Sequence, residues 1–151
     1  MGLDDSVCHK ISRKMLSILQ EICEKQLLAQ DDLTPEQAEK YKEYENAITY
    51  LDQFKADDIL LSALAKGAIG DAFAQLGQID DAYDYYIQAS KVSENMYSTP
   101  KYLYKAAMLG AENGKIKQAI SFLERIEKEY PKAEEAKWVA VQKGKLEHMN
   151  P

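Results

Sequence analysis

Residues 77–89 read GQIDDAYDYYIQA, residues 114–126 read GKIKQAISFLERI, and residues 42–54 read KEYENAITYLDQF. Aligned without gaps, all three carry an apolar residue third, alanine sixth, an aromatic residue ninth and a bulky residue tenth. Apolar side chains at spacings of three, four and seven form one face of an α-helix. An alanine in that face lets a neighbouring helix approach closely. The stretches therefore predict three helices, with these residues in their buried columns: Ala47, Ala82, Ala119, Tyr44, Tyr50 and Tyr86.

A further helical stretch precedes each of the segments at residues 77–89 and 114–126. Residues 59–76 end before Gly77, and residues 101–113 end before Gly114. Glycine at these places permits the left-handed conformation that closes many helices. Asp57 or Asp58 suits the N-cap of the first stretch, and Thr99-Pro100 supplies an N-cap and a first-turn proline for the second. The chain therefore repeats a helix, a tight turn and a second helix at a period of about 35 residues.

This pattern resembles the tetratricopeptide repeat (TPR) family. The residues that match the family's slots are Gly70, Phe73, Gly77, Ala82, Tyr86 and Ala89 in residues 63–94, and Leu103, Ala107, Gly114, Ala119, Leu123 and Tyr130-Pro131 in residues 100–133. Gly110 departs from the family, which usually has a large aromatic residue there, and residues 95–99 lengthen one connection. The resemblance covers residues 58–131 and implies an all-α, right-handed superhelical solenoid of antiparallel helix pairs.

The rest of the chain completes one predicted all-α domain, residues 1–151, of about seven helices. Thr34-Pro35-Glu36-Gln37 is a capping box that starts a helix over residues 35–54, the second helix of a degenerate unit. TPR units occupy residues 58–94 and 98–131, and a capping helix occupies residues 132–149. Residues 6–30 form a helix with a wide apolar face. That helix either packs antiparallel on residues 35–54 or pairs with a second chain to make a homodimer.

Composition excludes several classes of function. The chain has 151 residues and a net charge of −6, and residues 31–58 hold nine acids and three bases. This acidic balance disfavours nucleic acid and anionic membranes. No apolar run is long enough to span a bilayer, and the N-terminus lacks the pattern of a secretory signal. We therefore expect a cytoplasmic protein, or one associated with the cell envelope if an anchor precedes this sequence.

The sequence holds no recognisable catalytic or metal-binding motif. His9 and His148 stand near opposite ends, and Cys8-His9 with Cys23 match no structural zinc spacing. Gly67-Ala68-Ile69-Gly70 lacks the lysine and the strand context of a phosphate loop, so it predicts a tight helix crossing instead. We expect no enzyme activity, no cofactor, no metal and no small-molecule substrate.

The expected function is non-catalytic protein–protein interaction. In TPR proteins the first helix of each unit lines a concave groove. The repeats are also similar to those of bacterial TPR proteins of the cell envelope. The groove is predicted to bind a protein or peptide through Asp71, Lys101, Tyr104, Met108, Glu112 and Trp138, with Leu64, Gly67, Gln75 and Gln142 beside them. Tyr104, Met108 and Trp138 are the apolar anchors. The alternative is a structural self-association module that dimerises through residues 6–30.

Overall fold

Helices account for most of the backbone of residues 34–55 and 57–149, the part of the chain that the computed structural model describes. These residues contain no strand and form α2 (Pro35–Asp52), α3 (Ile59–Gln75), α4 (Ile79–Val92), α5 (Ser98–Glu112), α6 (Ile116–Glu129) and α7 (Ala136–Met149). The predicted all-α class is confirmed. The predicted helix over residues 6–30 lies outside the described residues. None of the described helices is long and apolar enough to cross a membrane.

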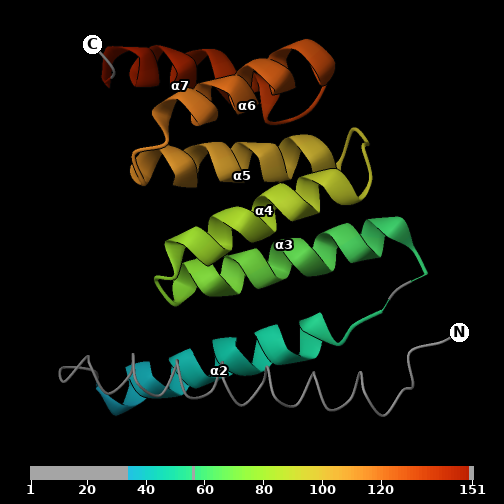
Figure 1. Ribbon diagram of the computed structural model, residues 1–151, viewed down its shortest axis with the longest axis vertical. Coiled ribbons are helices and arrows are strands. Elements are labelled where there is room, and N and C mark those ends of the chain that lie inside the picture. Colours follow the sequence, from blue (N-terminus) through green and yellow to red (C-terminus); the bar gives the residue numbers. More distant parts are fainter. Residues whose placement is uncertain (1–33, 56, 150–151) are drawn as a thin grey trace, which may run out of the picture. The chain divides into compact units, whose positions relative to one another are not determined.

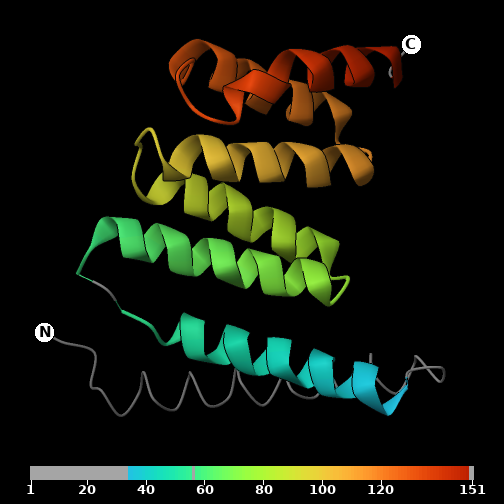
Figure 2. The ribbon, with the colours of Figure 1, turned by 180° about the vertical axis from the view of Figure 1, so that it is seen from behind.

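Successive helices pack on one another from α3 to α7, and α3 also contacts α5 (Figures 1 and 2). Contacts divide the chain into residues 1–43 and residues 44–151, so α3 to α7 belong to one unit. Short connections make consecutive helices antiparallel, which brings the starts of α3 and α5 to the same edge as the end of α4 (Figure 1).

Two identical turns close the α3–α4 and α5–α6 hairpins. Gly77 and Gly114 have φ angles of 73° and 76°, as predicted. After α3, the Gln78 N–H donates to the Phe73 carbonyl at 2.9 Å; after α5, the Lys115 N–H donates to the Gly110 carbonyl at 2.7 Å. Both are the six-to-one bonds of a Schellman motif. They satisfy carbonyls that a helix end leaves without partners.

The helix starts are capped by side chains, with one change from the prediction. Thr34 and Gln37 exchange the two bonds of a capping box, at 2.9 and 3.3 Å. Asp58 accepts from the N–H groups of Leu60 and Leu61, at 2.7 and 3.2 Å.

The change concerns α5, where Thr99 is not the N-cap. The helix begins at Ser98, and the Asn95 side-chain oxygen accepts from the N–H groups of Tyr97 and Ser98, both at 2.8 Å. The Thr99 hydroxyl donates instead to the Ser93 carbonyl at 3.0 Å. Asn95 takes the capping role because its amide also donates to Ser93 and Ser98, which fixes the whole 93–98 turn.

The last helix starts later than predicted, at Ala136 rather than at residue 132. Pro131 has no N–H to continue α6 and disfavours the helical conformation at Tyr130. The chain makes turns instead, in which the Ala133 N–H donates to the Tyr130 carbonyl at 3.0 Å. Ala133 is nevertheless buried, so the turn packs on the core before α7 begins.

The alanine column is confirmed where helices pair. Ala82 and Ala119 are 0% and 1% exposed. In α2, by contrast, the prediction that Tyr50 is buried is wrong, because its exposed fraction is 75%. Ile48 is the buried residue of α2. Residues two positions apart in the sequence point in directions about 200° apart around a helix, so Tyr50 faces away from the side on which Ile48 is buried.

Candidate functional site

A charged and aromatic cluster joins α3, α4 and α5 around Asp71. The Tyr86 hydroxyl of α4 donates to Asp71 Oδ1 at 2.6 Å. Lys105 of α5 donates to the same oxygen at 2.5 Å. The Asp71 and Lys105 side chains are 50% and 33% exposed, so this ion pair sits at the surface above a buried hydroxyl contact. We call Asp71, Tyr86, Lys105 and the residues stacked on them, Tyr102 and Lys101, the Asp71 cluster.

Two stacked tyrosines form the floor of the Asp71 cluster. The rings of Tyr86 and Tyr102 lie 6.4 Å apart and 14° from parallel. The Lys105 ammonium lies 5.3 Å from the Tyr86 ring centre, and the Lys101 ammonium lies 5.6 Å from that of Tyr102. A cation over an aromatic face is attracted by the ring quadrupole. The two lysines therefore cover the rings from the solvent side.

Glycines make room for these rings. A Cβ atom on Gly67 would lie 2.0 Å from Tyr102 Cε1, and one on Gly70 would lie 2.8 Å from Tyr86 Cδ1. A tight helix crossing was predicted at these glycines. At Gly70 an added Cβ would also lie 3.3 Å from the Ala82 carbonyl oxygen of α4, whereas at Gly67 the close neighbour is a tyrosine ring rather than a helix backbone. The expectation that Gly67 faces an open groove is wrong, because Gly67 is buried beneath the Tyr102 ring.

Burial raises the pKa of both stacked tyrosines. Desolvation raises the pKa of Tyr86 well above its ordinary value, and the hydrogen bond to Asp71 raises it further. Desolvation also raises the pKa of Tyr102, with a smaller contribution from the Asp71 charge. Both phenols therefore keep their protons to higher pH than an exposed tyrosine does, and Tyr86 donates its proton in the hydrogen bond to Asp71.

The predicted groove residues fall into three settings. Asp71 and Lys101 belong to the Asp71 cluster. Tyr104 and Met108 are half-buried and pack against the core that α5, α6 and α7 share. Glu112 is exposed, and Trp138 is 59% exposed. The structure thus brings Asp71 and Lys101 together through the tyrosine floor, whereas Tyr104 and Met108 present only part of their surface.

Tyr86, Tyr102 and Lys105 were absent from the predicted site. The missing signal is contact between residues 34 or 35 places apart, slightly fewer than the 37 that separate the equivalent Gly77 and Gly114. Asp71 pairs with Lys105, which is 34 residues away, and the Gly67 and Tyr102 that meet are separated by 35 residues. Opposite charges or a glycine and an aromatic at that spacing would have identified them.

A second contact between the two hairpins joins the α3–α4 turn to the α5–α6 turn. Asp80 accepts from Asn113 Nδ2 at 2.8 Å and from Lys115 Nζ at 3.1 Å. The Lys115 ammonium also lies 4.1 Å from the Tyr83 ring centre. The Tyr83 ring occupies the space left by Gly110, where an added Cβ would lie 2.8 Å from it. An aromatic side chain from α4 thus fills the space that Gly110 of α5 leaves.

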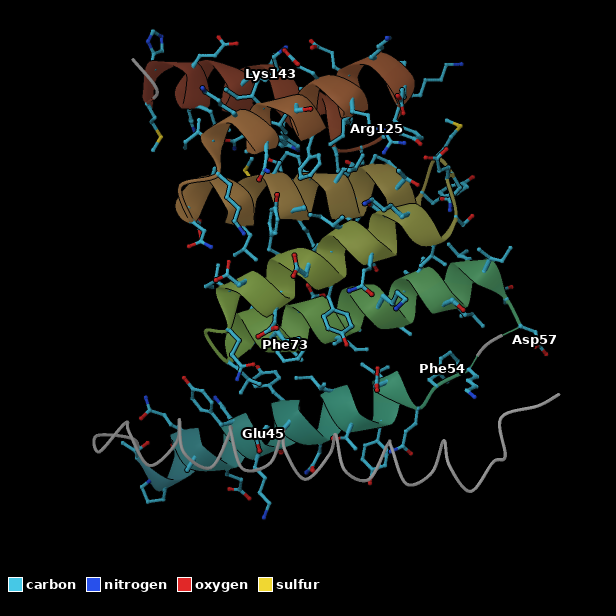
Figure 3. The ribbon with its side chains drawn as sticks, viewed as in Figure 1. Glu45, Phe54, Asp57, Phe73, Arg125 and Lys143 are labelled. Atoms are coloured by element: carbon cyan, nitrogen blue, oxygen red, sulfur yellow. The ribbon has the colours of Figure 1, made fainter. Side chains whose placement is uncertain are left out.

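Arg125 links α6 to the α4–α5 connection, at the end of the helices away from the Asp80 contacts. It donates to Glu94, in the α4–α5 connection, and to Glu129, both at 2.7 Å (Figure 3). Lys143 of α7 similarly bonds Glu127 of α6 at 2.9 Å. The pairs with Glu94 and Glu127 link neighbouring segments, whereas Arg125–Glu129 lies within α6, and each pair contributes little to stability.

No family model, curated protein or solved structure matches this chain.

The described residues offer no obvious reaction centre. Residues 34–55 and 57–149 contain no group of three His, Cys, Asp or Glu side chains that could hold a metal ion. Cys8, His9 and Cys23 lie outside these residues. In the Asp71 cluster the carboxylate is already bonded to an ammonium and a phenol, so the cluster is suited to fixing helices and presenting polar side chains.

Proposed function

We propose that the chain is a TPR-like protein whose α3–α4 and α5–α6 hairpins are equivalent units of a right-handed solenoid, and that it binds a polypeptide without catalysis. The observation that supports this proposal is a recurring offset between contacting residues of the two hairpins. Gly67 meets Tyr102, Asp71 meets Lys105, and Asp80 meets Lys115, at separations of 34 or 35 residues. Equivalent residues such as Gly77 and Gly114 are 37 residues apart, so each contact joins a residue to one two or three places before its equivalent. Such a nearly constant offset is expected where each unit stacks on the next by the same step.

The proposed binding face consists of the outward side chains of the first helices, α3 and α5, and of α7. Its members are Leu64, Asp71, Gln75, Lys101, Glu112 and Trp138, with the visible edges of Tyr104 and Met108. Lys101 and Glu112 lie near opposite ends of α5, so a bound peptide would meet opposite charges at its two ends. Exposed tryptophan is strongly favoured among residues that dominate binding energy.

The experiment compares affinity capture by the wild-type chain and by a Lys101→Ala, Trp138→Ala double variant. Both side chains are exposed, so the variant should keep its helicity, unlike one that truncates the half-buried Tyr104. The matched control is Lys117→Ala, an exposed lysine of α6. We expect quantitative mass spectrometry to show specific partners with wild type and control that the double variant loses. Equal recovery by all three would refute the proposed face.

A further inference from the structure

Asn113 and Gly114 form the only Asn-Gly pair in the sequence. Asn113 is the C-cap of α5, Gly114 makes the turn into α6, and both residues are exposed. The side-chain carbonyl carbon of an asparagine, Cγ, can be attacked by the peptide nitrogen of the next residue. Glycine favours this attack because it has no Cβ to hinder the approach. Sequence and exposure therefore mark Asn113 as a candidate site for deamidation.

Deamidation of this pair needs no reagent other than water. The Gly114 nitrogen forms a bond to Asn113 Cγ and loses its proton. The bond between Cγ and Nδ2 breaks, and the nitrogen leaves with that proton as ammonia. Water then opens the resulting five-membered cyclic imide at one of its two carbonyl groups. One opening leaves aspartate at residue 113, and the other leaves isoaspartate, in which the main chain runs through the former side chain.

The folded turn holds the reacting atoms apart. With the ψ angle of Asn113 at 20°, the Gly114 nitrogen nearly eclipses the backbone nitrogen of Asn113 and lies away from its Cβ. Ring closure needs the opposite arrangement, in which the Gly114 nitrogen eclipses Cβ. The Gly114 N–H is also bonded to the Ala111 carbonyl, at 3.2 Å. The α5–α6 turn must therefore open before Asn113 reacts, and the rate follows the population of the open turn.

The other hairpin holds this turn closed through Asp80. This residue, in the first turn of α4, accepts from Asn113 Nδ2 at 2.8 Å and from Lys115 Nζ at 3.1 Å. The two bonds fix the residues on both sides of Gly114, and the α3–α4 and α5–α6 turns lie at the same end of the helix stack (Figure 1). The amide nitrogen that deamidation removes is therefore the one that bonds Asp80.

We propose that Asn113 deamidates spontaneously in the folded protein, that its contact with Asp80 slows the reaction, and that the product weakens the junction between the two hairpins. A carboxylate at residue 113 cannot donate to Asp80 and repels it instead. The new charge also lies at the C-terminal end of α5, beside Glu112, where the helix dipole disfavours a negative charge. Because ammonia is lost, the change is irreversible.

Peptide mapping by mass spectrometry measures the reaction during incubation of the full chain at mildly alkaline pH. The folded wild type should convert Asn113 to aspartate and isoaspartate at least about tenfold more slowly than the same chain in urea, because the turn must open first. Asp80→Ala should speed conversion in the folded chain by about two- to fivefold, the effect of losing one exposed polar contact. Asp84→Ala, which changes another exposed aspartate of α4, is the matched control and should leave the rate unchanged.

Asn113→Asp reproduces one product of the reaction and tests its effect on the junction. Asn113→Ser is the matched control, because it loses the amide that bonds Asp80 without gaining a charge. The aspartate variant should unfold at a lower urea concentration than the serine variant. The difference between them should shrink at high salt, which screens the repulsion from Asp80.

Three rate measurements would overturn the proposal: no conversion of Asn113 in the folded wild type, conversion as fast in the folded chain as in urea, or equal rates in Asp80→Ala and Asp84→Ala. An Asn113→Asp chain as stable as Asn113→Ser would refute the weakening of the junction. None of the substituted residues belongs to the proposed binding face, so these results are independent of the partner-capture experiment.

Discussion

At the scale of single residues, the contact between Gly67 and Tyr102 is the tightest constraint in the structure. The site of a Gly67 Cβ lies 2.0 Å from a ring atom of Tyr102, whose exposed fraction is 3%. The ring cannot swing away freely, because it is stacked on Tyr86. Gly67→Ala should therefore lower the free energy of unfolding by about 1–3 kcal/mol, as overpacking does. Urea unfolding followed by circular dichroism measures the change.

Gly144→Ala is the matched control for that substitution. Gly144 lies within α7, and an added Cβ there meets nothing within 4 Å. Alanine favours a helix interior over glycine by up to about 1 kcal/mol, so this change should stabilise the protein. If Gly67→Ala stabilised it as well, the close approach of α3 to Tyr102 would be contradicted.

A second residue-scale prediction concerns alkaline pH. Burial and the bond to Asp71 raise the pKa of Tyr86 above its ordinary value of 10.0. The unfolded chain therefore releases this proton at lower pH than the folded chain. The stability that the protonated phenol contributes is fully present below about pH 10 and declines as pH rises above it.

Urea midpoints between neutral and strongly alkaline pH measure that decline. Tyr86→Phe should start less stable but lose less with rising pH, since it removes one such phenol. Tyr97→Phe is the matched control, because Tyr97 is 80% exposed and bears the same substitution. A Tyr86→Phe slope equal to that of wild type would show that the phenol is not protonated preferentially in the folded state.

At the scale of helices and turns, sequence signals worked best where one residue dictates the backbone. Gly77 and Gly114 fix two hairpin turns, and Thr34 with Gln37 fixes the start of α2. The starts of α5 and α7 were missed by a few residues for different reasons. Asn95 outcompetes Thr99 as a cap through its amide, and Pro131 adds a turn before α7. Both causes are local, but each depends on which of several neighbouring polar or turn residues forms the bonds, and helical spacing does not reveal that.

The turn at Gly114 gives the prediction at this scale. Its φ of 76° is disfavoured for residues with a Cβ, although nothing obstructs the Cβ itself. Gly114→Ala should lower the free energy of unfolding by about 1–2 kcal/mol. Gly114→Asn should cost less, because asparagine tolerates this conformation. Equal losses for both in urea unfolding would mean that backbone strain is not the cause.

At the scale of the whole molecule, the sequence predicted the helices of α3 to α7 better than it predicted the site. The alanine columns define the buried faces, and Ala82 and Ala119 occupy them. The pairing between hairpins was missed because Asp71, Tyr86 and Tyr102 lie on different helices. Only a search for opposite charges about one repeat apart, within a few residues of exact equivalence, would have joined Asp71 to Lys105. Tyr50 was misplaced because a repeated position is buried only where a neighbouring helix covers it.

Tyr102 couples the α3–α4 hairpin to α5, and its removal should separate the unfolding of the two ends. Its ring contacts Gly67 of α3 and stacks on Tyr86 of α4. In stacked helical hairpins, cooperative unfolding depends on such nearest-neighbour interfaces. Trp138, the single tryptophan, lies in α7 and reports the far end by fluorescence, while circular dichroism reports all helices.

In the wild type the two signals should therefore follow one urea transition, as cooperative unfolding requires. Tyr102→Ala should destabilise the chain by about 3 kcal/mol, within the range for truncating a buried aromatic. It should also make the fluorescence transition occur at higher urea than the circular dichroism transition, because α5 to α7 keep their shared core of Leu103, Leu123 and Val139. Tyr97→Ala, at an exposed position, should leave the two transitions coincident. Coincident transitions in Tyr102→Ala would show that other contacts, such as that of Asp80 with Lys115, suffice to couple the hairpins.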